Sequence, residues 1–200
     1  MVTKKTTVLK KDESKVAKEK VTSYYLLKIR WVCFPRLLNR TVLFRTNGSF
    51  VQLDRVMRFV IGADTDHLSC FEDESGTIAS FTGFGIDKED DVCDNSYAKK
   101  TLKWVSLNSK DEFFYTYDFG DNYRFRIKVE YETVEKPGNE LAYVIKGKGQ
   151  GIWEDEIGAL YDLLSGGKVE EDEEEYSDRA KSIEEFAIDI EPYVYDDSLL

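Results

Sequence analysis

Four acidic residues of this chain could act together, although they form two pairs that are distant in the sequence: Asp118, Asp121, Glu154 and Asp155. Carboxylate oxygens are the ligands that Mg²⁺ and Ca²⁺ prefer, so a fold that brings the two pairs together would create a cation site. Turn and helix-cap chemistry accounts for the same residues, because two of them flank a turn glycine and the other two precede an apolar helical stripe. We therefore expect no metal, and these four carboxylates are the alternative metal ligands.

His67 is the single histidine, so a metal site built from several histidines is excluded. No serine or cysteine stands out as a nucleophile beside it. We therefore expect no catalytic residue and no cofactor. The residues that we expect to contact a binding partner are His67, Asp118, Asp121, Tyr123, Glu154 and Asp155.

The segment 113–130 predicts an aromatic β-hairpin. Aromatic side chains recur at every second position up to Phe119, and from Tyr123 onward an apolar row alternates with a charged row. Between them lie three residues that are typical of turns, Gly120, Asp121 and Asn122. Alternation with a period of two on both sides of such a turn indicates two antiparallel strands.

Hydrophobic periodicity predicts the remaining elements. Ser49 and Gln52 form a capping-box pattern before apolar residues at helical spacing, which predicts a helix of about three turns that ends at Gly62. Further strands are predicted at 24–34, 41–46, 67–72, 78–84 and 143–145, helices at 153–164 and 97–107, and a short terminal element at 182–186. The class is therefore α+β: a mixed or antiparallel sheet with a central aromatic β-hairpin, packed against two or three helices.

The helix predicted at 153–164 matters for the site. Glu154 and Asp155 would lie in its first turn, where the helix dipole favours acids. The glycine-rich stretch 147–151 precedes this helix, and it lacks the spacing of a phosphate-binding loop. We expect that stretch to be a connector.

Charge divides the chain into four predicted parts. Residues 1–22 carry seven lysines and three acids and predict a basic flexible arm, and residues 23–166 form the α+β core domain. Residues 167–180 predict an acidic linker, and residues 181–200 are expected to pack back on the core through Phe186 and Ile188. No apolar run is long enough to cross a bilayer and no secretory signal is recognised, so we expect a cytoplasmic protein.

The net charge of −11 is concentrated at the end of the chain. Residues 167–200 carry a net charge of −10, which leaves −5 for the middle once the +4 of the basic arm is included. An acidic core disfavours contact with phosphates. We therefore expect the partner to be another protein, with no direct nucleic-acid binding by the core and no membrane.

The run Tyr115-Thr-Tyr-Asp-Phe-Gly-Asp-Asn-Tyr-Arg-Phe-Arg-Ile resembles the signature hairpin of the Ri-plasmid ORF-3-like family. That family includes the TnpR-like passenger proteins of insertion-sequence elements, and its pattern reads Tyr-x-Tyr-Asp-Phe-Gly-Asp-x-Trp-x-His-x-Ile. Asp66-His67-Leu68 with Phe71, and Trp153-Glu154-Asp155 with Gly158 and Tyr161, agree with the family in the same order. The resemblance covers roughly residues 24–200. It implies an α+β fold and the setting of a mobile genetic element, and it implies no established reaction.

Four positions depart from the family pattern. Tyr123 replaces its Trp, Phe125 replaces its His, Ser69 stands where a second His is common, and Trp153 replaces a Pro. The resemblance implies that any role of those two histidines in metal binding or proton transfer is lost in this chain.

Three hypotheses of function follow. The leading one is an accessory or interaction protein of a plasmid, phage or transposable element, which binds a protein without catalysis, because aromatic residues surround a polar turn. The second is an acidic inhibitor that mimics nucleic acid against a host or phage defence nuclease, on account of the acidic run at 168–178. The third is a metal-dependent hydrolase that uses the carboxylate cluster, with His67 beside it.

Overall fold

The computed structural model describes residues 21–63, 67–81, 112–167 and 179–195, and within the long strand it leaves the side chains of 131–134 and 136–137 undescribed. The helix predicted at 97–107 lies outside these ranges, as do residues 1–20 of the predicted arm and residues 168–178 of the predicted linker.

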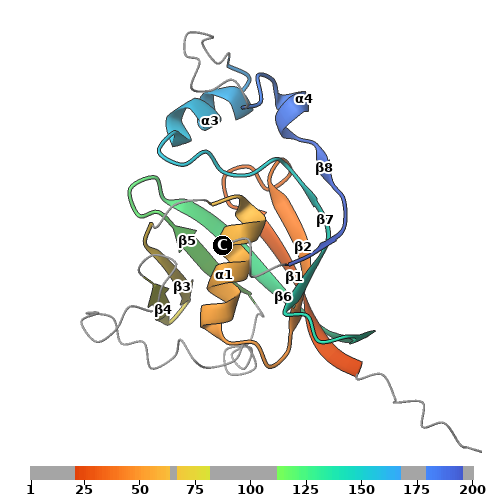
Figure 1. Cartoon of the computed structure of the whole chain (residues 1–200). Helices are drawn as coiled ribbons and strands as arrows, with labels where there is room; N and C mark the ends of the chain where they lie inside the picture. Colours follow the sequence, from red (N-terminus) through yellow and green to blue (C-terminus); the bar gives the residue numbers. More distant parts are fainter. Residues whose placement is uncertain (1–20, 64–66, 82–111, 168–178, 196–200) are drawn as a thin grey trace, which may run out of the picture.

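Nine strands form one antiparallel sheet in the order β4-β3-β5-β6-β1-β2-β7-β8, and β9 also pairs with β7 (Figure 1). The bounds are β1 Val21–Trp31, β2 Asn39–Arg45, β3 Ser69–Asp73, β4 Gly76–Phe81, β5 Glu112–Tyr117, β6 Tyr123–Pro137, β7 Ala142–Lys148, β8 Asp189–Ile190 and β9 Tyr193–Val194. With its helices this sheet confirms the predicted α+β class.

The predicted hairpin is formed by β5 and β6, in the middle of the sheet. Phe113 pairs with Ile127 and Tyr115 pairs with Phe125, and all four side chains are buried. The outward row of β6, which includes Arg124 and Arg126, is exposed. Strand β6 continues beyond the predicted hairpin segment 113–130, because β1 provides ladder partners for β6 as far as Pro137.

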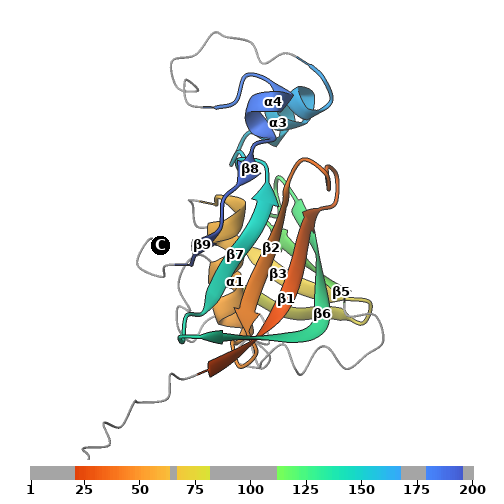
Figure 2. The same cartoon turned by 90° about the vertical axis from the view of Figure 1, so that its right-hand side faces the viewer.

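Helix α1 (Phe50–Ile61) covers one face of the sheet (Figures 1 and 2). Its predicted start and end are confirmed: Ser49 and Gln52 form both bonds of the capping box, and Gly62 ends the helix with a φ of +76°. The apolar side of α1 meets the aromatic side chains of β3 and β5, for example through the ring contacts of Phe50 with Phe71 and Phe113. No helix in the described ranges is both long enough and apolar enough to span a membrane.

The helix predicted at 153–164 begins four residues later, as α3 (Ile157–Leu164). Asp155 has a φ of +60°, which a helix cannot include, and no acid occupies the first turn of α3. The prediction that Glu154 and Asp155 stabilise the helix start is therefore wrong. Both acids lie in a turn that precedes the helix.

The terminal element is α4 (Ile183–Phe186), capped by Ser182, and it is followed by the two short strands against β7. Phe186 is fully buried, whereas Ile188 is 45% exposed, so only the first of the two expected anchors packs against the core. Figure 1 shows α3 and α4 together beyond one end of the sheet.

Candidate functional site

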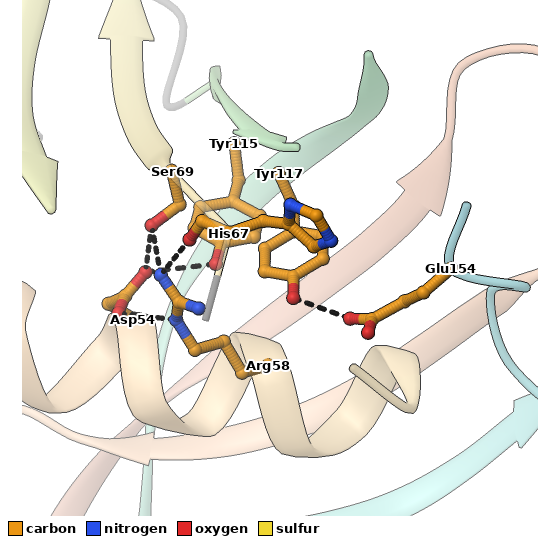
Figure 3. A network of polar contacts seen from close by, with 7 residues as sticks. All are labelled: Asp54, Arg58, His67, Ser69, Tyr115, Tyr117 and Glu154. Atoms are coloured by element: carbon orange, nitrogen blue, oxygen red, sulfur yellow. Dashed lines mark hydrogen bonds and ion pairs between the residues drawn. The ribbon is translucent and has the colours of Figure 1, made fainter. Parts of the chain in front are cut away.

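A buried polar network supports the end of the sheet that carries the hairpin turn (Figure 3). Asp54 on α1 accepts three hydrogen bonds, from Arg58 Nε at 2.9 Å, Ser69 Oγ at 2.6 Å and Tyr115 Oη at 2.9 Å. Arg58, which is fully buried, also donates to the backbone oxygen of His67 at 2.9 Å. The network therefore joins α1, β3 and β5, and it fixes the backbone at His67.

The electrostatics of this network keep the phenol of Tyr115 protonated. Burial, and then the negative charge of Asp54, raise the pKa of Tyr115 well above its ordinary value. The phenol is thus a permanent donor to the carboxylate. One feature of the sequence could have predicted this buried ion pair. Asp54 and Arg58 are four residues apart on the otherwise apolar face of a helix.

Asp118 builds the hairpin turn with one carboxylate oxygen. Its Oδ1 accepts from the backbone N–H of Gly120 at 2.9 Å and, at 3.4 Å, from that of Asp121. Asp118 and Asn122 adopt left-handed φ angles of +53° and +57°, which Asp and Asn tolerate better than most residues. The turn role predicted for Asp118 is confirmed for Oδ1.

The second carboxylate oxygen of Asp118 faces His67. The distance from Asp118 Oδ2 to His67 Nδ1 is 3.8 Å, and the other ring nitrogen, Nε2, lies 3.7 Å from Asp155 Oδ1. One ligand atom from each of these three residues lies within 4.8 Å of the others. We call His67, Asp118 and Asp155 the tip cluster; it joins a loop, the hairpin turn and the turn before α3.

Asp121 lies beside the tip cluster. Burial raises the pKa of its carboxyl group, and the charges of Asp118 and Asp155 raise that pKa further. The hydrogen bond from the backbone N–H of Ile157 and the electrostatic effect of the His67 imidazole lower it. Three carboxylates are thus close enough to repel one another, with one imidazole among them. A divalent cation would relieve that repulsion, and an imidazole with carboxylates is a ligand set that such ions accept.

Glu154 and Tyr123 have other roles. The phenol of Tyr117 donates to Glu154 Oε1, and the phenol of Tyr123 donates to the backbone oxygen of Trp153 (Figure 3 shows the first). Tyr123 is fully buried, so the expectation that it contacts a partner does not agree with its position. The two tyrosines instead fasten residues 153–154 to the hairpin, and the adjoining Asp155 lies near His67.

Sequence comparison assigns the chain. The profile of the plasmid pRiA4b ORF-3-like proteins matches residues 23–194. The chain belongs to this family. A crystal structure of a protein of unknown function, MM3350 from Methanosarcina mazei Go1, has a similar fold, with a TM-score of 0.57 and 24% sequence identity over 78% of this chain and 87% of that one. No curated protein has significant similarity to the chain.

Three positions that the sequence resemblance singled out, Ser69, Tyr123 and Phe125, have structural roles in this chain. All three side chains are buried. Ser69 takes part in the Asp54 network, and Phe125 packs in the core. None of these three side chains is exposed at the surface beside the tip cluster.

Proposed function

We propose that this family member is a non-catalytic accessory protein of a mobile element, acting in the cytoplasm, and that it binds a protein partner through the tip of the β5–β6 hairpin. The observation that carries the proposal is the exposure of two large apolar side chains at the tip: Phe119 is 51% exposed and Leu68 is 45% exposed. Both are next in sequence to members of the tip cluster. Protein interfaces commonly have aromatic side chains at their centre and polar groups at their rim, and the tip has the same arrangement.

Hydrogen bonds hold the backbone around these two residues in place, as expected for a preformed binding surface. The N–H of Asp118 donates to the oxygen of Leu68 at 2.8 Å, and the N–H of Asn122 donates to the oxygen of Asp118 at 2.5 Å. A partner would therefore meet a tip that is already ordered. A preorganised surface loses less conformational entropy on binding than a mobile one.

Replacing Phe119 by alanine is expected to weaken partner binding by 2 kcal/mol or more, because an aromatic anchor at an interface centre contributes about that much. The measurement is quantitative co-purification of a tagged full-length chain from the native host, followed by titration of the purified partner. Val194→Ala is the matched control, because Val194 is 48% exposed but lies on β9. A partner that is lost equally in both variants, or retained in both, would contradict the proposal.

A second candidate, a metal-dependent hydrolase, is favoured by the geometry of the tip cluster. Asp118 is 7% exposed and uses Oδ1 for the turn, while Oδ2 is directed toward His67. A buried carboxylate oxygen, an imidazole and the 75% exposed carboxylate of Asp155 would leave one side open for water and substrate.

Mn²⁺ titration tests this second candidate. If the tip cluster binds the ion, wild-type protein takes up one equivalent and Asp118→Asn weakens the affinity at least tenfold, while the asparagine can still accept the turn hydrogen bond. Asp162→Asn on α3 is the control, because Asp162 is an exposed carboxylate that is not a member of the tip cluster. Hydrolysis of a model phosphodiester with Mn²⁺ should be lost in the same variant. Absence of stoichiometric binding, or equal weakening by the control, would exclude the hydrolase.

A further inference from the structure

The face of the sheet opposite α1 carries opposed cations. In Figure 2, α1 lies on one side of the strands β1, β2 and β7, and in the described part of the chain no helix covers the other side. On that side Arg30 of β1 lies directly opposite Arg126 of β6, and Lys28 lies directly opposite Lys128. Like charges at opposed positions of neighbouring strands destabilise a sheet. Two such pairs in succession, in a chain with a net charge of −11, call for an explanation.

These four cations line a groove with a volume of about 380 Å³. Two acids share the lining, Glu112 and Glu130, and Trp31, Val32 and Pro35 form the remainder. Glu130 forms an ion pair with Lys28, and Glu112 lies opposite Lys128 in the ladder. The groove therefore retains a positive charge, and that charge is concentrated in the row of the two arginines.

The arginine row contains no acid between β5 and β2. Its order across the sheet is Phe114, Arg126, Arg30 and Asn39. Arg126 lies over the ring of Phe114, with 5.8 Å between its Cζ atom and the ring centroid, and Arg30 forms no ion pair with any described residue. Two guanidinium groups that face each other across one ladder position can bind the same phosphate from both sides.

We propose that this groove binds a single strand of nucleic acid by its phosphates. One phosphate lies between Arg30 and Arg126, and the next lies toward the row of Lys28 and Lys128, where Glu130 and Glu112 offset part of the positive charge. The two rows are two residues apart along each strand, a separation of about 7 Å, and successive phosphates of an extended nucleic-acid strand are separated by a similar distance. Val32 and Pro35 add apolar surface at one end of the groove.

This proposal is independent of the function proposed for the hairpin tip, and it departs from the expectation that the acidic core does not bind nucleic acid. That expectation used the net charge of the core as a whole. The alternation of side chains along β1 and β6 instead collects basic residues on one face, so the local charge of the groove is opposite in sign to that of the chain.

Fluorescence anisotropy of labelled 12-nucleotide oligo(dT) and oligo(rU), titrated with the full chain at about 50 mM salt, tests the proposal. Arg30→Ala and Arg126→Ala should each weaken binding about tenfold, and each should reduce the slope of log K against log salt by about 0.7. Lys181→Ala, which removes one exposed cation near α4, should change the affinity less than twofold. Comparison of the two oligonucleotides then decides between DNA and RNA as the bound strand.

A stability measurement separates a binding role from a structural role. If the arginines serve a ligand, removing one of two opposed like charges should leave the melting temperature unchanged or raise it while binding is lost. A lower melting temperature in both arginine variants would overturn the proposal. So would a wild-type chain that does not bind either oligonucleotide, equal weakening by Lys181→Ala, or displacement of the oligonucleotide by a poly-glutamate peptide of equal charge at equal concentration, which would assign the groove to an acidic protein.

Discussion

Replacing Arg58 by methionine is expected to lower the free energy of unfolding by about 3–5 kcal/mol, because the change leaves the buried carboxylate of Asp54 without its cation. Arg58 is fully buried and Asp54 is 4% exposed, so water cannot substitute for the lost partner. Methionine retains most of the volume and the flexibility of the arginine side chain. Urea denaturation followed by circular dichroism gives the free energy directly.

Two controls identify the cause of that loss. The double variant Asp54→Leu/Arg58→Met removes both charges, and we expect it to be more stable than Arg58→Met alone, since no unpaired charge remains. Glu130→Gln breaks the Lys28 ion pair, whose side chains are 39% and 31% exposed, and it should cost less than 1 kcal/mol. A double variant whose loss equals the sum of the two single losses would show that the charges of Asp54 and Arg58 are not coupled.

Replacing Gly149 by alanine is expected to cost about 2–4 kcal/mol of stability. Gly149 has a φ of +90°, and a β-carbon there would lie 2.3 Å from the backbone oxygen of Leu37. The backbone would have to move, in addition to the cost of a left-handed alanine. The neighbouring loop is held to β2 by Arg40, which donates to the backbone oxygens of Lys148 and Gly149, so there is little freedom for that movement.

Gly166 provides a matched control that separates the steric clash from the cost of a left-handed alanine. It has the same φ of +90°, but no atom lies within 4 Å of the position of its β-carbon. Gly166→Ala should therefore cost only the conformational strain, about 1 kcal/mol. Thermal or urea denaturation of both variants measures the difference. Equal losses would mean that the close approach to Leu37 does not constrain the loop.

Local patterns were sufficient to predict the parts of this fold that are stabilised locally. The capping box at Ser49 and the glycine at 62 satisfy the ends of α1 with groups only a few residues away, so the sequence alone predicts both ends. The β5–β6 hairpin is likewise determined by its turn and by alternation. These predictions required no knowledge of distant partners.

The predictions failed where the partner is distant in the sequence. The start of α3 is displaced because Tyr117 and Tyr123, 37 and 30 residues before their partners, hold the segment at 153–154. The extension of β6 depends on β1, which is more than 100 residues away. In the same way, Asp155 approaches His67 only through tertiary contacts, and the opposed arginines become visible only when the register of β1 and β6 is known.

Photo-crosslinking from the hairpin tip in the living host tests most directly whether the tip binds a protein partner. A photo-crosslinking phenylalanine analogue placed at Phe119 should attach covalently to one defined protein, because the side chain is exposed on an ordered turn. The same analogue at Ile188, which is 45% exposed beyond α4, should not give that product. A single crosslinked partner at position 119 alone is the predicted result. The same products from both positions, or no product from position 119, would contradict recognition through the tip.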